Sequence, residues 1–309
     1  MSISLSHLTK HYGKTHAVED VNAEITHGSL PAILGPSGSG KSTLLKLISG
    51  LEKPDEGTVV IDGEDMTKVD PRHRDIGFCF QHYAPFRHMN VAKNVGFGLK
   101  VRKRPAKEIE RRVNDLLALV KLESKAKSFP AQLSGGLAQR VQIARSIAHR
   151  PTVLFLDEPS AGLDPQSRMA MWTAVEGLRK EGITVLLTTH YMEEADSLAN
   201  RVAIIDYGRV LALGSPEKLK ATLGAHTIFD LKLKSTHNLE PVVASLKARP
   251  DVTRAEVTAE GLRVIAATSD GLLPDIVQAA SSFGLRDLAI TEPSLETVFI
   301  KLTGRDLRE

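Results

Sequence analysis

The first fifty residues combine a continuous apolar run with an apolar pattern of helical spacing. Leu30–Leu34 is a short apolar run, which predicts a buried strand. A glycine-rich segment, Gly35–Gly40, follows it directly. Beyond this segment four apolar positions recur at i, i+3, i+4 and i+7, namely Leu44, Leu47, Ile48 and Leu51. This spacing predicts a helix that ends near Gly50, so the pattern as a whole predicts a strand, a loop and a helix in succession.

The middle of the chain changes from helical spacing to alternating elements. Residues 91–150 have mostly helical spacing, interrupted at Pro105 and Pro130. From residue 151 short apolar runs alternate with amphipathic stretches. The predicted strands are Thr152–Leu156, Thr184–Thr188 and Val202–Asp206, and a predicted helix is Arg168–Lys180. Strands that alternate with helices in this way predict a doubly wound α/β sheet.

The pattern changes again near Gly224. The predicted elements are the strands Thr227–Leu233, Thr253–Ala259, Leu262–Ala267 and Leu285–Ile290 and the helices Leu239–Ala248 and Leu272–Phe283, followed by a last helix from Ser294. The order β-α-β-β-α-β predicts a small α+β domain of the ferredoxin-like kind over residues 225–309. The last helix places Leu295, Val298, Phe299 and Leu302 on one face, which it must bury.

Composition narrows the class of protein. The chain has 309 residues, of which 42% are hydrophobic and 25% charged, as in ordinary globular proteins. With 40 basic and 37 acidic residues it carries no excess of positive charge that would indicate a nucleic-acid partner. Its single cysteine, Cys79, forms no internal disulfide and suits a reducing compartment. Because no apolar run approaches the roughly 20 residues of a membrane helix, work at a membrane would require a partner.

The glycine-rich segment carries the first chemical motif. It matches the phosphate-loop pattern G-x4-G-K-[ST] with Gly35, Pro36, Ser37, Gly38, Ser39, Gly40, Lys41, Ser42 and Thr43. Glycines let backbone N–H groups approach phosphate oxygens, and the helix that follows presents its positive end to them. Lys41 is expected to reach the β- and γ-phosphates, and the Ser42 hydroxyl to bind Mg²⁺.

Two carboxylates follow a second apolar run. Val153–Leu156 is a predicted buried strand, and Asp157 and Glu158 come directly after it. The carboxyl ends of the strands are where α/β sheets bind ligands. Asp157 is expected in the metal shell, and Glu158 as the general base that polarises the attacking water.

A second helix start resembles an anion site. Ser134, Gly135 and Gly136 precede a predicted helix, Leu137–His149. A chain with two phosphate-binding helix starts and one nucleotide suggests that the second serves the ATP of a neighbouring chain.

Together these motifs resemble the ATP-binding cassette proteins from about residue 3 to residue 222. The matching positions are Tyr12, Gln81, Ser134, Gly135, Gly136, Ser160–Asp164 and His190. The resemblance implies that Tyr12 stacks on adenine, that Gln81 joins the metal shell and that His190 contacts the γ-phosphate. It implies that Ser134–Gly136 and Asp164 lie at a dimer seam. One position departs from the family, which usually has glutamine where this chain has Leu137.

The resemblance also implies an architecture and partners. A P-loop cassette is expected over residues 1–224, with a helical subdomain at about 82–150. The expected cofactors are ATP and Mg²⁺. The expected partners are a second cassette, identical or paralogous, and separate transmembrane permease subunits, which would hold the protein at the cytoplasmic face of the membrane; no nucleic acid is expected.

Different segments of the chain indicate opposite directions of transport. Gln81–Asn90 resembles the sulfate-importer ATPases. Gly162–Arg168, Thr188–Asp196 and Glu292–Gly304 resemble the drug-exporter ATPases of the daunorubicin-resistance type. Sulfate importers carry an all-β tail, whereas this tail has two clear helical stretches, so the sequence favours an exporter of a drug, lipid or similar substrate. The alternatives are an importer of a sulfate-like anion and a soluble cassette ATPase.

Overall fold

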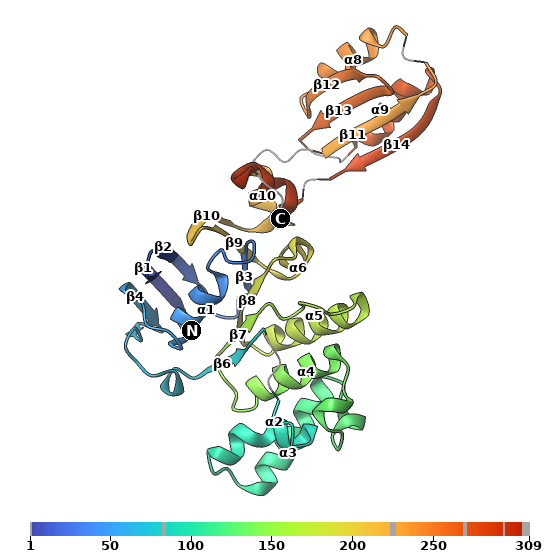
Figure 1. Cartoon of the computed structure of the whole chain (residues 1–309). Helices are drawn as coiled ribbons and strands as arrows, with labels where there is room; N and C mark the ends of the chain where they lie inside the picture. Colours follow the sequence, from blue (N-terminus) through green and yellow to red (C-terminus); the bar gives the residue numbers. More distant parts are fainter. Residues whose placement is uncertain are drawn as a thin grey trace. The chain divides into compact units, whose positions relative to one another are not determined.

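The computed structural model of the chain describes residues 2–81, 85–222, 227–235, 237–267, 271–292 and 294–304 (Figure 1). The chain divides between Ser215 and Pro216 into two compact units, each of which is described by itself. The domain boundary predicted from the sequence, between residues 224 and 225, lies outside the described residues.

The larger unit contains two sheets. An antiparallel sheet has the strand order β2-β1-β4-β5, with bounds β1 Ile3–Tyr12, β2 Thr15–Ile25, β4 Glu56–Ile61 and β5 Glu64–Asp65. A six-stranded sheet has the order β10-β9-β3-β8-β7-β6, with bounds β3 Pro31–Leu34, β6 Ile76–Cys79, β7 Val153–Asp157, β8 Thr184–Thr189, β9 Arg201–Asp206 and β10 Arg209–Gly214. Five of these six strands run parallel and β10 is antiparallel to β9. The α/β alternation predicted from the sequence is thus confirmed.

The register of the parallel strands brings three strand ends together. Leu34 at the end of β3 lies opposite Thr189 of β8, and Asp157 at the end of β7 lies opposite Thr188 of β8. All residues of β7 and β8 are buried. The loops that follow these strands therefore start from a rigid, water-excluded edge of the sheet.

Helices surround this sheet and form a separate layer at one end of the larger unit (Figure 1). The helices of the larger unit are α1 Lys41–Ser49, α2 Val91–Val101, α3 Ala106–Leu119, α4 Gly135–Ser146, α5 Pro165–Lys180 and α6 Met192–Leu198, with short 3-10 turns at Pro71–His73, Glu123–Lys125 and Pro130–Gln132. Pro105 and Pro130 lie at helix starts, as their lost N–H requires. Among the described residues no helix has both the length and the apolar character to cross a bilayer.

The core of the larger unit lies between the antiparallel sheet, α1 and the parallel sheet. Its buried members include Leu8, Leu45, Ile48, Phe155 and Leu186. Helix α1 ends where the sequence predicted, because Gly50 adopts φ 77° and its N–H caps the carbonyl of Leu47. The phosphate-loop helix is therefore fixed against the sheet along its whole length.

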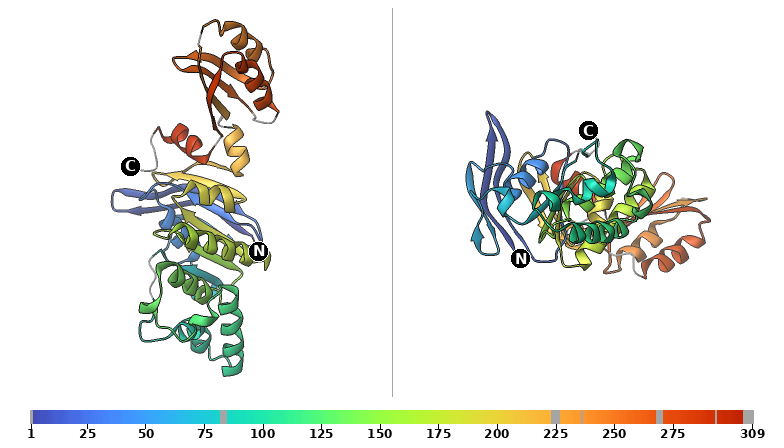
Figure 2. Two further views of the ribbon diagram at one scale, coloured as in Figure 1. Left: turned by 90° about the vertical axis from the view of Figure 1, so that its right-hand side faces the viewer. Right: turned by 90° about the horizontal axis from the view of Figure 1, so that it is seen from below.

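The smaller unit has one antiparallel sheet of strand order β12-β13-β11-β14. Its elements are α7 Pro216–Thr222, β11 Thr227–Leu233, α8 Glu240–Lys247, β12 Val252–Thr258, β13 Gly261–Ala266, α9 Leu272–Ser281, β14 Leu285–Thr291 and α10 Leu295–Thr303. Alternate residues of the strands pack with α8 and α9 into a separate core around Phe229, Val264 and Ile276, and both helices cover the same face of the sheet (Figure 2). The tail is thus an α+β unit with the predicted order of elements.

The last helix lies apart from this core and contacts α7 within the same unit. Its predicted apolar face is buried at Leu295, Val298 and Phe299, and Leu302 is half-buried. Ser294 caps the helix, since its hydroxyl accepts from the backbone N–H of Thr297. The i, i+3, i+4, i+7 pattern therefore identified the correct face.

Candidate active site

The phosphate loop connects β3 to α1 and packs tightly against neighbouring backbone. A Cβ atom at Gly35 would lie 2.3 Å from the carbonyl oxygen of Ile205, and one at Gly40 would lie 2.1 Å from that of Ala17. Gly40 also adopts φ 102°, which side-chain-bearing residues rarely reach. Ser37 and Gly38 are exposed at the tip of the loop. Glycine is thus required at the base of the loop by contact with β2 and β9.

Polar groups of the loop suit a phosphate ligand. The Ser39 side chain is 3% exposed, and its hydroxyl has no hydrogen-bond partner among the described residues. Pro36 is half-buried, and Ser42 and Thr43 stand half-buried in the first turn of α1. An unpaired hydroxyl beside the free N–H groups of a helix start fits an anion that supplies acceptor oxygens.

The Lys41 side chain connects the phosphate loop to the end of β7. Its ammonium donates to the carbonyl oxygens of Gly35 and Pro36, each at 2.9 Å, and lies 3.2 Å from Oε1 of Glu158. Only 3% of its side chain is exposed. The lysine charge is therefore held at the point where the loop and the end of β7 meet.

Asp157 is fixed by two hydroxyl groups. Its Oδ1 accepts from Ser42 Oγ at 2.8 Å and from Thr188 Oγ1 at 2.7 Å. The residue is 4% exposed. A buried carboxylate beside a serine hydroxyl offers the hard oxygen ligands that Mg²⁺ prefers, so this pair fits the predicted metal shell.

Glu158 is the point on which the predicted site residues converge. Its carboxylate contacts Lys41, accepts from Gln81 Nε2 at 3.0 Å through Oε2, and lies 3.2 Å from Nδ1 of His190 at the same oxygen. The side chain is 11% exposed. Segments far apart in the sequence, at residues 41, 81, 158 and 190, thus meet at one carboxylate.

The backbone of Glu158 has a strained conformation that Thr188 holds in place. Its φ is 46°, in the left-handed region that non-glycine residues seldom occupy. Its N–H donates to both the carbonyl oxygen and the hydroxyl of Thr188, at 3.1 and 3.0 Å. Thr188 therefore positions Asp157 and Glu158 together. The sequence placed Thr188 at the end of a predicted strand and in the segment Thr188–Asp196, but neither pattern indicated a role for it in the site.

The remaining predicted residues lie elsewhere in the larger unit. Tyr12 ends β1 with 48% of its surface exposed, and the Lys10 ammonium lies 5.5 Å from the centre of its ring. Ser134 and Gly135 are exposed at the start of α4, and Gly136 is buried there. A Cβ at Gly136 would lie 2.4 Å from Ser167 Oγ, so the start of α4 packs on the start of α5.

Asp164 caps α5 and is thereby bound within its own segment. Its Oδ1 accepts from the N–H of Ser167 at 2.9 Å, and the hydrogen bonds from Ser167 hold the pKa of Asp164 below its ordinary value. The contacts of Gly136 and Asp164 are with α5 rather than with the phosphate loop. This separation within one chain is what a site shared between two chains requires.

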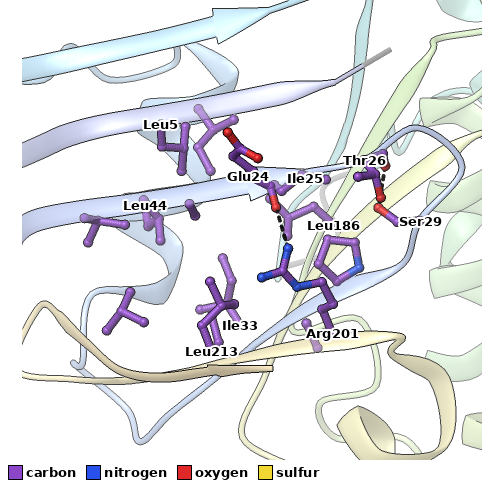
Figure 3. Close-up of a pocket in the computed structure, with 17 residues that line it drawn as sticks. Leu5, Glu24, Ile25, Thr26, Ser29, Ile33, Leu44, Leu186, Arg201 and Leu213 are labelled. Carbon is purple, nitrogen blue, oxygen red and sulfur yellow. Dashed lines mark hydrogen bonds between the residues drawn. The ribbon is translucent and has the colours of Figure 1, made fainter. Parts of the chain in front are cut away.

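A small cavity lies in the core of the larger unit, away from the candidate active site (Figure 3). It measures about 40 Å³ and is lined mainly by apolar side chains such as Leu5, Ile33 and Leu44. Its polar groups bind one another, since Arg201 Nη1 donates to the Glu24 carbonyl at 3.1 Å. A cavity of this size is far smaller than the several hundred Å³ of a typical ligand pocket, so it is a packing gap.

Comparison with known proteins agrees with this geometry. The family described as ABC transporter matches residues 18–161. The sulfate/thiosulfate import ATP-binding protein CysA of Nocardia farcinica is 51% identical over 70% of this chain and 65% of its own length, and that of Bacillus cereus is 46% identical over 74% and 66%. A dimeric cassette structure, MJ0796 with ADP and Pi, is 32% identical with TM-score 0.63 over 69% of this chain and 98% of that one.

The chain spans 65 and 66% of the length of these two curated relatives. Their names favour the import alternative over the export interpretation that the sequence motivated. The tail has helices as well as strands, as expected, but the names of the relatives do not support the export interpretation that was based on the class of the tail. The matched length, 216 to 235 residues, is close to that of the larger unit, and the class of the tail therefore does not decide the direction.

Proposed function

Because this chain belongs to the ABC transporter family of ATP-binding cassettes, we propose that it binds ATP with Mg²⁺ and hydrolyses the ATP to drive transport. The observation that carries the proposal is the convergence of Lys41, Gln81 and His190 on the Glu158 carboxylate. A structural ion pair would need one cation, whereas this carboxylate has three polar neighbours from three loops. Such a group at the carboxyl edge of a parallel sheet suits the acceptance of a proton from a water that attacks a bound substrate.

Each residue has a role that its surroundings support. Lys41 binds the β- and γ-phosphates, and the glycine loop supplies N–H donors. Ser42, Gln81 and Asp157 hold Mg²⁺, which when bound neutralises phosphate charge. Glu158 accepts the proton of the attacking water, and His190 orients that water and the γ-phosphate. Tyr12 stacks on the adenine ring.

The second set of residues acts on a neighbour. Ser134, Gly135, Gly136 and Asp164 face the nucleotide of a second cassette, so hydrolysis requires a dimer. Support comes from their separation from the phosphate loop and from the dimeric state of the cassette MJ0796. Leu137 stands half-buried directly after the glycines, so the backbone of the motif remains available.

The transported substrate is proposed to be an imported oxyanion of the sulfate class. The names of the relatives support this, as does the resemblance of Gln81–Asn90 to sulfate importers. Separate transmembrane subunits would bind the chain peripherally at the cytoplasmic face of the membrane and would form the path for the anion.

The smaller unit is proposed to be a ferredoxin-like accessory domain. Its order of elements and its antiparallel sheet β12-β13-β11-β14 support this class. It contains no cluster of three or more His, Cys, Asp or Glu residues that could hold a metal, as far as the chain is described. A role in assembly or regulation therefore suits it better than chemistry.

The experiment that tests the proposal is reconstitution of the chain with the permease subunits of a sulfate-class importer in membrane vesicles. Vesicles should transport radiolabelled sulfate only when ATP is supplied on the membrane face that carries the cassette. The sulfate should move toward that face, which is the import direction. Asp157→Asn should abolish both ATP hydrolysis and transport. Hydrolysis without sulfate movement would leave the ATPase assignment standing and refute the substrate; no hydrolysis by the assembled wild-type complex would refute both.

A further inference from the structure

A polar cluster lies buried behind the candidate active site, between α5, α6 and the loop that follows Glu158. Its centre is Glu194 of α6, none of whose surface is exposed. Nε1 of Trp172 on α5 donates to Oε1 of this carboxyl at 3.0 Å. Burying a carboxyl group is costly unless it is neutral or fully paired, so a residue of this kind needs a reason to be there.

Three polar atoms of the cluster have no hydrogen-bond partner among the described residues. They are Oε2 of Glu194, Oγ of Ser160 and Nε of Arg168. Unpaired buried polar atoms are uncommon in native proteins, so three in one place need a structural or functional explanation. Ser160 is 1% exposed, so the bulk solvent does not satisfy its hydroxyl.

The cluster reaches both loops that carry the predicted chemistry. Ser160 belongs to the loop between Glu158 and Asp164. Thr189, another neighbour of the Glu194 carboxyl, immediately precedes His190 and accepts from the N–H of Tyr191 at 2.9 Å. The cluster is therefore a direct link between these two loops.

An aromatic stack extends the link to the His190 ring. The centre of the Tyr191 ring lies 4.1 Å from that of His190 and 4.4 Å from the guanidinium carbon of Arg168. Arg168 stands in the first turn of α5, directly after the loop that Asp164 ends. Arg168 and Tyr191 thus connect the start of α5 to the His190 ring.

We propose that Glu194 is a positioning residue that holds the His190 loop and the Ser160–Asp164 loop in one arrangement and so aligns Glu158 with His190. The inference rests on the proposed ATPase function. Glu194 acts through Ser160, Thr189 and the Trp172 indole, and does not touch the reacting atoms. Its effect is therefore on the rate of the chemical step rather than on nucleotide affinity.

The carboxyl group is suited to this role in its neutral form. A protonated carboxyl has one O–H donor, which the hydroxyl oxygens of Ser160 or Thr189 can accept, while its other oxygen keeps the Trp172 bond. Burial raises the pKa of Glu194, and the side chains of Thr189, Ser160 and Trp172 and the Arg168 charge act in the opposite direction.

Few other charges face this carboxyl. Helix α5 contributes Arg168, the segment after β8 contributes His190 and Tyr191, and the loop after Glu158 contributes the neutral Ser160. On α6 itself Glu193 is exposed and Asp196 is half-buried, and β3, packed against α6, has no titratable side chain. Burial is therefore the dominant influence on the proton of Glu194.

The first experiment measures ATP hydrolysis by the full chain. Glu194→Gln keeps the donor and the acceptor, so kcat should stay within about twofold of wild type. Glu194→Ala should lower kcat on the order of 10- to 100-fold with KM for ATP nearly unchanged, because misalignment acts on the rate. Glu193 is the exposed neighbour on the same helix, and Glu193→Ala should leave both kcat and KM for ATP unchanged. Wild-type kcat in Glu194→Ala, or equal loss in both Glu194 variants, would overturn the proposal.

The second experiment needs no ATPase activity and so separates this inference from the proposed function. In the wild type, a raised pKa means that the folded state keeps a proton that the unfolded state releases as pH rises above the ordinary value of glutamic acid. The free energy of unfolding of the wild type therefore decreases as the pH rises above that value. Glu194→Gln removes this decrease, because an amide does not titrate. The gain in Tm of Glu194→Gln over wild type should be larger at pH 8 than at pH 5. A gain that is absent or independent of pH would refute the neutral carboxyl, even if Glu194→Ala did not fold.

Discussion

At the scale of single residues, the Glu158 carboxylate combines a strained backbone with three polar neighbours. Its φ of 46° is kept by two hydrogen bonds to Thr188, and its side chain is held by Lys41, Gln81 and His190. Strain of this kind costs about 1–3 kcal/mol and persists where the surroundings impose it.

Glu158→Gln is the most direct test of the general base. The amide keeps the size of the side chain but cannot accept a proton, so hydrolysis should fall by a factor on the order of 10² or more while ATP binding persists. Single-turnover hydrolysis and equilibrium binding of a fluorescent ATP analogue measure the two quantities. Near-normal hydrolysis would remove Glu158 from this role.

Gly40 provides a test of the loop geometry. Gly40→Ala would place a Cβ 2.1 Å from the Ala17 carbonyl at φ 102°, so the free energy of unfolding should fall by at least about 2 kcal/mol, and ATP affinity should fall with it. Gly98→Ala in α2 is the matched control, because its new Cβ would lie in open space. The free energy of unfolding of this variant should rise by about 0.5–1 kcal/mol. Urea titration measures both. Equal stability of the two variants would contradict the tight packing of the loop.

Sequence patterns predicted which residues lie together, but not what holds them. The sequence motifs include Lys41, Gln81 and His190, which contact the Glu158 carboxylate, and Asp157, which contacts Ser42. Thr188 and Glu194 could not be found this way, because their importance comes from contacts between strands and helices that are distant in sequence. A threonine inside a buried run and a glutamate in a charged stretch look ordinary until the register of β7 and β8 is known.

At the scale of elements, the start of α4 is separated from the phosphate loop and packs on the start of α5. A Cβ at Gly135 would lie 3.9 Å from Leu163 and one at Gly136 would lie 2.4 Å from Ser167, so the two helix starts lie side by side. Together they are the surface that the proposed second cassette would meet. A change there should affect turnover by the dimer and leave nucleotide binding by one chain intact.

Ser134→Arg tests this separation. The bulky cation should reduce steady-state ATP hydrolysis by at least about tenfold, since the neighbour's nucleotide loses its hydroxyl contact, while monomer affinity for ATP changes little. Ser124→Arg introduces the same side chain at an exposed position of the same helical layer and should leave turnover unchanged. Loss of ATP binding by the Ser134→Arg monomer would show that the site is not shared.

The boundaries of most elements could be predicted from apolar periodicity. The predicted helix Leu239–Ala248 is α8 at Glu240–Lys247, and the predicted strand Leu285–Ile290 is β14 at Leu285–Thr291. The direction of transport could not be predicted from the tail, because β11 to β14, with α8 and α9, form a core of their own around Phe229. A unit with its own core can be joined to a cassette of either transport direction, so its class carries no information about direction.

At the scale of the whole molecule, two separate hydrophobic cores indicate that each unit can fold without the other. A chain ending at Ser215 should therefore remain folded and should bind ATP with an affinity within about threefold of the full chain, because loop and carboxylates lie wholly in the larger unit. Isothermal titration measures the affinity, and transport by the assembled complex should suffer instead. If the folded truncated chain bound no ATP, the smaller unit would have to contribute to the nucleotide site.

The pairing of Lys41 with Glu158 has a further consequence for the energetics of nucleotide capture. The same ammonium that should bind the γ-phosphate lies 3.2 Å from a carboxylate of its own chain, so Glu158 is an internal competitor of ATP. Binding must exchange one buried ion pair for another, and the apparent affinity is lowered by the free energy of the pair that is broken. Removing the negative charge in Glu158→Gln should therefore tighten ATP binding to a single chain, before any dimer forms. Glu158, the proposed general base for hydrolysis, would then also shorten the time for which a single chain retains ATP.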